Sequence, residues 1–436
     1  MKKEYKLGLW EAVSIGVGTM IGAGIFSILG VGASIAENNL PISFFLAGLV
    51  AYLIAYSYAK LGSKYISNAG PIEFIIRGIG DNYITGTLSI LMWFIYVVSI
   101  SLFSKAFAGY FLALIKLPLT SFYLGVVEIT IISFFTALNF FGSKAVGKAE
   151  FFIVLIKLSI LGIFIVFGIW TINPEFIKPI LDQKHIFNIF FAASILFLTY
   201  TGFGLITNAS ENIKNPEKNV PLAIYISLSV VSIIYILISI VALGNLGTEG
   251  LSKAQEYALA EAAKPFLGGI GFTLVALGAM FSTSSAINAT LYGGANIAYA
   301  LAKKGELPKE FERKVWFSGS VGLYITSGLS MFFVIAFNLE EIASITSYFS
   351  LIIYLFVIIS HYRLSEETKG SKALIVFSFV VVCMVFLTLV IYQWKSEKVV
   401  FFTSIIVFVL AFVFELIYKS ITHRTFTERK KSKKLI

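Results

Sequence analysis

The sequence predicts an all-α integral membrane protein with twelve transmembrane helices. The first ten form two inverted repeats of five, and the last two are additional. Three observations support this fold class. The 436 residues are 58% hydrophobic and 13% charged, with a mean hydropathy of +0.87, a composition that soluble globular proteins do not have. The apolar residues form runs long enough to cross a bilayer, and glycine-rich interruptions occur in the first and sixth runs.

Twelve apolar runs are predicted to be membrane spans. They cover residues 10–36, 42–66, 81–113, 122–140, 148–171, 186–212, 219–244, 267–302, 322–338, 341–361, 373–394 and 399–419. The third and eighth runs are longer than the bilayer core needs, so we expect them to tilt or to project from it. The N-terminal MKKEYKLGLWEAV leads directly into the first span, and we expect no cleavable signal peptide.

Lysine and arginine residues are distributed unequally between the two sides. With an even number of spans, the side that carries both termini has 25 of the 34 Lys and Arg residues, against 7 on the other side. Cytoplasmic loops of membrane proteins are enriched in these residues. We therefore expect a multi-pass protein of the plasma membrane with cytoplasmic termini. This bias explains the net charge of +10, so we predict no nucleic acid partner.

Two spans contain weak helical segments. Four glycines lie within nine residues of the first span, Gly16 to Gly24, and each costs a helix about 1 kcal/mol relative to alanine. The sixth span contains Tyr200-Thr201-Gly202-Phe203-Gly204-Leu205. Spans five apart cross the membrane in opposite directions, which is typical of two inverted repeats. We therefore predict discontinuous helices in spans one and six.

The repeat pattern divides the chain into four parts. We predict a first repeat (1–172), a second repeat (186–361), two accessory spans (373–419) and a basic cytoplasmic tail (420–436).

Interrupted helices can bind a zwitterion through their main chain. Free N–H groups suit a carboxylate and free carbonyls suit an ammonium group, so no charged side chain is needed. Phe203 is expected to form a lid or wall of the pocket. The alternative is that Gly18-x-x-x-Gly22 only packs helices together. The predicted substrate contacts are Thr19, Met20, Ile21, Gly22, Ala23, Gly24, Ile25, Tyr200, Thr201, Gly202, Phe203 and Gly204.

Three ordered groups of residues resemble motifs of the amino acid–polyamine–organocation transporter superfamily, and most of all its archaeal, proton-coupled amino acid transporters of broad specificity. The resemblance implies a leucine-transporter-like fold and secondary active transport by alternating access. The groups are Gly22-Ala23-Gly24-Ile25-Phe26; Tyr200-x-Gly202-Phe203 with Glu211-Asn212-Ile213-Lys214-Asn215-Pro216 and Val220-Pro221-x-Ala223-Ile224; and Asn288-Ala289 with Tyr299-Ala300-Leu301-Ala302-x-x-Gly305-Glu306-Leu307-Pro308.

Lys157 interrupts the apolar run FFIVLIKLSI of the fifth span. It lies nine residues beyond Lys148, which places it about 14 Å along the helix, near the middle of the bilayer. An ionisable residue at this depth is functional or paired, and a buried lysine can exchange its proton near neutral pH. The alternative is a structural lysine satisfied by carbonyl groups.

The resemblance implies that Lys157 carries the coupling proton. Its ammonium group would take the place of Na⁺ between carbonyls of span one, near Gly18, and the span-eight hydroxyls of Ser282 and Ser285. The rival interpretation is a true Na⁺ site that uses the hydroxyls of 282–285. Glu128 is a second candidate for a proton carrier, and Lys105 is expected to reach the outer interface.

The predicted function is H⁺-coupled symport of neutral L-amino acids of broad range. Alternatives are an amino acid exchanger and a Na⁺-coupled symporter of the same fold. An enzyme is not expected, because paired acids, a histidine cluster and a nucleophile–base pair are absent from the spans. An ATP-driven pump is disfavoured, because G-x-x-x-x-G-K-[ST] does not occur and no predicted cytoplasmic loop is large enough for a nucleotide-binding domain. We predict no cofactor and no metal site, and we expect a monomer.

Overall fold

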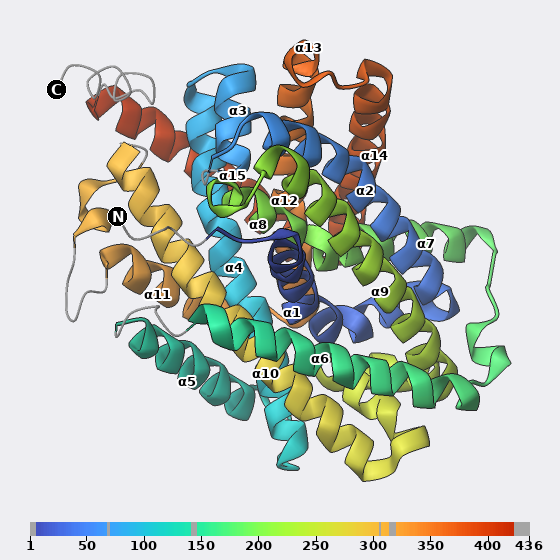
Figure 1. Cartoon of the computed structure of the whole chain (residues 1–436). Helices are drawn as coiled ribbons and strands as arrows, with labels where there is room; N and C mark the ends of the chain where they lie inside the picture. Colours follow the sequence, from blue (N-terminus) through green and yellow to red (C-terminus); the bar gives the residue numbers. More distant parts are fainter. Residues whose placement is uncertain (1–5, 68–69, 141–145, 305–306, 314–319, 423–436) are drawn as a thin grey trace.

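The computed structural model describes residues 6–67, 70–140, 146–304, 307–313 and 320–422. Within these ranges the chain is almost entirely helical (Figure 1). Short helices and 3₁₀ turns join the long helices. The long helices are α1 (Leu9–Ala36), α2 (Leu40–Lys64), α4 (Tyr83–Leu114), α5 (Ser121–Phe140), α6 (Val146–Gly168), α7 (Gln183–Leu196), α9 (Pro216–Ala254), α10 (Ala258–Lys304), α11 (Val321–Ala336), α12 (Leu339–Arg363), α14 (Lys372–Ser396) and α15 (Lys398–Thr422).

This architecture confirms the predicted all-α membrane fold. By length and composition, nine stretches of the described chain could cross a membrane. Two of them, Gly24–Lys64 and Pro216–Tyr299, each join two helices, and two further apolar helices, Leu9–Gly22 and Val321–Ala336, are shorter. The twelve predicted spans therefore correspond to the twelve long helices.

Local sequence signals set several helix boundaries. Asn82 precedes α4, and its side chain accepts hydrogen bonds from the main-chain N–H groups of Ile84 and Thr85, as an N-cap residue does.

Two of the long helices are kinked at a glycine. In α9 and α10, Gly247 and Gly268 have φ values of 72° and 59°. These kinks lie close to the predicted end of span seven and the predicted start of span eight, so helical winding continues beyond the membrane-spanning parts.

Hydrogen bonds group the connections at two ends of the bundle. The terminal end comprises 7–9, 65–67, 70–81, 208–215, 363–371 and 418–422, and is joined by contacts such as Leu7 N–H to Asn212 O (2.7 Å) and Lys419 to Asp81 (3.2 Å). The opposite end comprises 36–40, 173–182, 247–257 and 337–341. Here Asn39 donates to Ile180 O and Thr248 donates to Asn38.

The predicted break in span six is a change of helical winding and not an unwound segment. Helix α7 ends at Leu196, the 3₁₀ helix η4 (Phe197–Phe203) follows, and the short helix α8 (Gly204–Asn208) completes the span. The predicted break in span one was wrong, because α1 is helical from Leu9 to Ala36. Its glycines are compatible with helical dihedral angles, and neighbouring helices pack directly on its main chain at these positions.

Helix α1 lies in the middle of the bundle. It contacts α9, α10, α7, α6 and η4, and Figure 1 shows it at the centre of the view with α9 beside it. At Gly16, a Cβ atom would lie 2.6 Å from Ser227 Oγ of α9. The cavity described below lies against this central helix, between α1, η4, α4 and α10.

Candidate functional site

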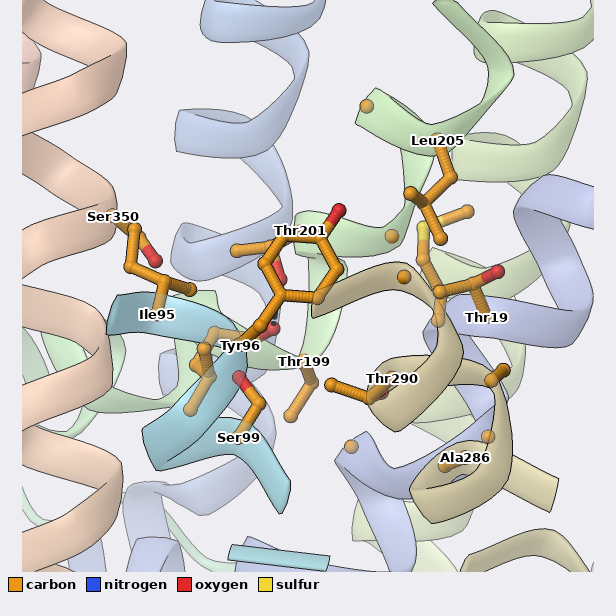
Figure 2. A pocket seen from close by; sticks show the side chains of 18 of the residues that line it. Thr19, Ile95, Tyr96, Ser99, Thr199, Thr201, Leu205, Ala286, Thr290 and Ser350 are labelled. Atoms are coloured by element: carbon orange, nitrogen blue, oxygen red, sulfur yellow. Dashed lines mark hydrogen bonds between the residues drawn. The ribbon is translucent and has the colours of Figure 1, made fainter. Parts of the chain in front are cut away.

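A cavity of about 250 Å³ lies within the bundle. This volume is slightly below the usual range for pockets that bind drug-sized ligands, and it suits a smaller molecule. Figure 2 shows side chains from α4, η4 and α10 converging on it. Its wall includes Gly18, Thr19, Met20, Gly22 and Gly24 of α1; Met92, Ile95, Tyr96 and Ser99 of α4; Leu198, Thr199, Thr201 and Gly202 of η4; Gly204 and Leu205 of α8; and Ser285, Ala286, Thr290 and Gly293 of α10.

The described wall of the cavity is uncharged. Its polar side chains are hydroxyls and one amide, with Thr19, Ser99, Thr199, Thr201 and Thr290 among them. Burying an unpaired charge in such surroundings is costly. The cavity therefore suits a ligand whose charges are balanced within itself or met by main-chain groups.

Main-chain groups face the cavity where the wall is built from glycine. Gly18, Gly22 and Gly24 of α1 and Gly202 of η4 all line it. A Cβ atom at Gly202 would lie 2.6 Å from Met20 N, and one at Gly24 would lie 2.7 Å from Thr199 Cβ. Side chains at these two positions would therefore prevent α1 and η4 from touching. The two glycine-containing segments singled out in the sequence meet here.

The predicted substrate contacts divide into two sets. Most of the predicted contacts with small side chains lie on the cavity wall, and so do Gly18 and Ser285, the predicted coupling-site contacts. Ile21, Ile25, Tyr200 and Phe203 are fully buried in the surrounding core instead, and Ser282 lies behind the wall. Ala23 belongs to α1, and its side chain is outside the described part of the structure. The predicted contacts that line the cavity are Thr19, Met20, Gly22, Gly24, Thr201, Gly202 and Gly204.

Phe203 does not form the expected pocket wall. Its ring packs edge-on against Tyr58, with centroids 5.3 Å apart, and stacks on Tyr354 with centroids 6.1 Å apart. Tyr200 also points away, and its hydroxyl donates to Phe44 O at 3.0 Å. In a 3₁₀ helix every third residue shares one face. Phe197, Tyr200 and Phe203 therefore form the buried face of η4, and the other residues of this turn line the cavity.

Lys157 lies on α6 directly behind the cavity wall. Its side chain is buried, and Nζ donates to Gly18 O at 2.6 Å. A Cβ atom at Gly22 would lie 3.8 Å from the same Nζ. Since Gly18 and Gly22 both line the cavity, Lys157 contacts the other side of the same stretch of α1.

The span-eight hydroxyls differ in their contacts. Ser282 Oγ donates to Gly22 O at 2.5 Å, and Ile21 O lies 3.3 Å away. Thr283 bonds back to Ala279 O of its own helix at 2.8 Å, as buried threonines in helices commonly do. Ser282 and Lys157 thus both donate to carbonyls of α1, from α10 and α6 respectively.

Lys105 does not reach the interface as expected. Nζ lies 3.3 Å from Glu128 Oε1, and the two side chains are only 12% and 2% exposed. The two residues lie at similar depths of α4 and α5, nine residues before Leu114 and seven after Ser121. Comparison of depths along the two adjacent spans is the sequence signal that predicts this pair.

Sequence reasoning missed the wall residues of α4 and, apart from Ser285, those of α10. Met92, Ile95, Tyr96 and Ser99 recur at helical spacing on one face of α4. This face has no distinct hydrophobic pattern, because α4 is buried on most sides. Only the packing of the neighbouring helices identifies the face that borders the cavity.

Comparison with known proteins gives consistent matches. The family model described as amino acid permease matches residues 7–418. The chain is 59% identical to an uncharacterized protein of Methanocaldococcus jannaschii over 98% of both chains. It is 34% identical to the inner membrane transport protein YbaT of Escherichia coli, over 89% of this chain and 91% of that one. The branched-chain amino acid permease BcaP of Bacillus subtilis is 25% identical over 75% of each chain.

Proposed function

The chain belongs to the amino acid permease family, whose members are transporters and not enzymes, and we propose that it carries neutral L-amino acids of broad range together with protons by alternating access. The observation that carries this proposal is the placement of Lys157. Its ammonium group bonds to the carbonyl of Gly18, and Gly18 borders the cavity. A protonatable group and the substrate would thus act on one segment of α1.

The uncharged wall supports a neutral substrate. The wall glycines bring the main chain of α1 and η4 to the cavity surface. Because α1 is a continuous helix, its N–H groups are engaged within it, but each carbonyl oxygen keeps a second lone pair that can accept from a substrate ammonium group. The wall hydroxyls can donate to the substrate carboxylate. A cationic or anionic side chain would find no opposite charge on the described wall. The relative named branched-chain amino acid permease also supports a neutral amino acid.

Protonation of Lys157 would favour one position of α1. The charged amine donates a stronger hydrogen bond to Gly18 O than a neutral amine does. Loss of the proton weakens this bond and makes it easier for α1 to move relative to α6. A ligand shifts a conformational equilibrium only through different affinities for the two states. Substrate on one face of α1 and a proton on the other would both favour the same state.

Ion-driven uptake into proteoliposomes tests this function. Alanine, serine and glutamine uptake is measured with an inward H⁺ or Na⁺ gradient imposed separately, for wild type, Lys157→Ala and the control Ser159→Ala. Ser159 is exposed on the same helix and bonds to Leu155 O. We expect uptake driven by the pH gradient in wild type and in the control, and its loss in Lys157→Ala.

Three results would contradict parts of the proposal. Uptake that requires Na⁺ would move the coupling site to the span-eight hydroxyls. Counterflow of amino acids that is independent of any ion gradient would indicate an exchanger. No accumulation of any of the three amino acids under either gradient would reject the substrate class.

A further inference from the structure

Tyr96 is the largest side chain that α4 places on the cavity wall. Figure 2 shows its ring extending from α4 into the cavity, with Ser99, Thr201 and Thr290 around it. The ring therefore occupies space that a bound molecule would otherwise use.

Two consecutive glycines of α10 accommodate this ring. A Cβ atom at Gly293 would lie 2.9 Å from Tyr96 Cε1, and one at Gly294 would lie 3.2 Å from Tyr96 Cβ. Two glycines in a helix interior cost about 1 kcal/mol each relative to alanine. The ring of Tyr96 explains Gly293, and Gly294 is explained by the approach of both Tyr96 Cβ and Thr326 Cγ2, each 3.2 Å from an added Cβ atom. A side chain at 293 would meet a movable ring and not a main-chain atom, so it would push the ring toward the cavity.

The arrangement of the wall indicates which part of a substrate Tyr96 meets. Four glycines line the cavity on the α1 and η4 side, Gly18, Gly22, Gly24 and Gly202, whereas α4 and α10 contribute one, Gly293, and present Tyr96, Ser99 and Thr290. An amino acid whose α-ammonium and carboxylate groups bind on the open α1 and η4 side directs its side chain toward α4 and α10.

We propose that Tyr96, seated against Gly293 and Gly294, limits the size of the amino acid side chain that the site accepts. This inference rests on the proposed function. It predicts that the protein discriminates among neutral amino acids by side-chain length, with alanine and serine preferred over phenylalanine. Removing the Tyr96 ring enlarges the space for the substrate side chain. Adding a side chain at Gly293 pushes the ring toward the cavity and reduces this space.

Competition experiments test this inference. Uptake of radiolabelled alanine into proteoliposomes is inhibited with unlabelled alanine, leucine or phenylalanine. The inhibition constant of each larger amino acid is divided by that of alanine, and this ratio is compared between variants. For Tyr96→Ala we expect the phenylalanine-to-alanine ratio to fall by about tenfold, the size of effect that small volume changes in apolar pockets produce. For Gly293→Ala we expect a shift in the opposite direction.

Two controls separate size from other effects. Tyr96→Phe keeps the ring and should retain the wild-type ratio. Gly328→Ala adds a Cβ atom on α11 with no atom within 4 Å, and it should change nothing. If Tyr96→Ala does not fold, Gly293→Ala decides alone.

If Tyr96→Ala changes the inhibition constants of all three competitors by the same factor, the assignment of Tyr96 is overturned. This failure differs from failure of the proposed function. In the first case wild type transports alanine and only the ratio stays unchanged. In the second, wild type accumulates no amino acid at all.

Discussion

The ammonium group of Lys157 and the hydroxyl of Ser282 bind neighbouring carbonyls of α1, at Gly18 and Gly22. Helix α1 is thereby linked to α6 on one side and to α10 on the other. Each donor is buried, and an unsatisfied buried donor costs about 1–3 kcal/mol. At the scale of single residues, the site therefore depends on polar side chains that lie behind the cavity as well as on those that line it.

The buried charge pair of Lys105 and Glu128 allows a direct test of stability. Removing Glu128 takes away the hydrogen-bonded partner of Lys105 and leaves Glu256 as its remaining acidic neighbour; breaking a buried pair costs up to about 3–5 kcal/mol. We expect Glu128→Ala to lower the unfolding free energy by this amount. Removing both charges with Lys105→Met and Glu128→Leu should recover most of the loss. Denaturant unfolding in detergent measures both. Equal losses in the single and double variants would show that the ion pair is not what stabilises this region.

At the scale of elements, η4 decides which side chains reach the cavity. Three residues per turn put Phe197, Tyr200 and Phe203 on the buried face. The Phe203 ring then joins Tyr58 and Tyr354 in an aromatic cluster. Tyr58 and Tyr354 line the cavity themselves, and Phe203 packs behind them. Aromatic pairs of this kind contribute about 0.5–1.5 kcal/mol each beyond their buried area.

Thiol labelling along η4 tests this assignment of faces. Cys383 is the single native cysteine, so Cys383→Ser provides a thiol-free background for new single cysteines. We expect Thr201→Cys to react with a small maleimide and to be protected by alanine, whereas Tyr200→Cys should not react. Equal reactivity at both positions would mean that η4 does not keep its 3₁₀ winding in the membrane.

At the scale of the whole molecule, contacts distant in sequence close the terminal end. Leu7 pairs with Ile213 as a short bridge, Tyr65 donates to Glu367 at 2.6 Å, and Lys419 binds Asp81. These contacts join the segment before α1 to the loop after α8, the end of α2 to the short helix α13 (Ser365–Thr368), and α15 to the segment before α4. A transporter that opens alternately on its two sides has to loosen such contacts on one side at a time.

The sidedness predicted from lysine and arginine can be measured in intact cells. In the Cys383→Ser background, Lys253→Cys marks the opposite end and Glu366→Cys marks the terminal end; both native side chains are exposed. A membrane-impermeant maleimide should label 253 and leave 366 unlabelled until the cells are permeabilised. The reverse result would invert the topology. Labelling of both in intact cells would contradict the odd number of spans between them, which are α10, α11 and α12.

The sequence by itself determined the membrane class, the twelve helices and the two glycine-containing segments. These features depend on hydropathy and length, which are local along the chain. It also singled out Lys157, since a charge in an apolar run is conspicuous without any fold.

Only the tertiary structure decided the rest. It kept α1 helical through its glycines, turned Phe203 away from the cavity and paired Lys105 with Glu128. It also placed Tyr96 against Gly293. In each case the physical reason is the same, because the outcome depends on local winding and on which helix lies opposite. Inside a membrane bundle apolar residues face both lipid and core. The hydrophobic pattern therefore does not distinguish these faces.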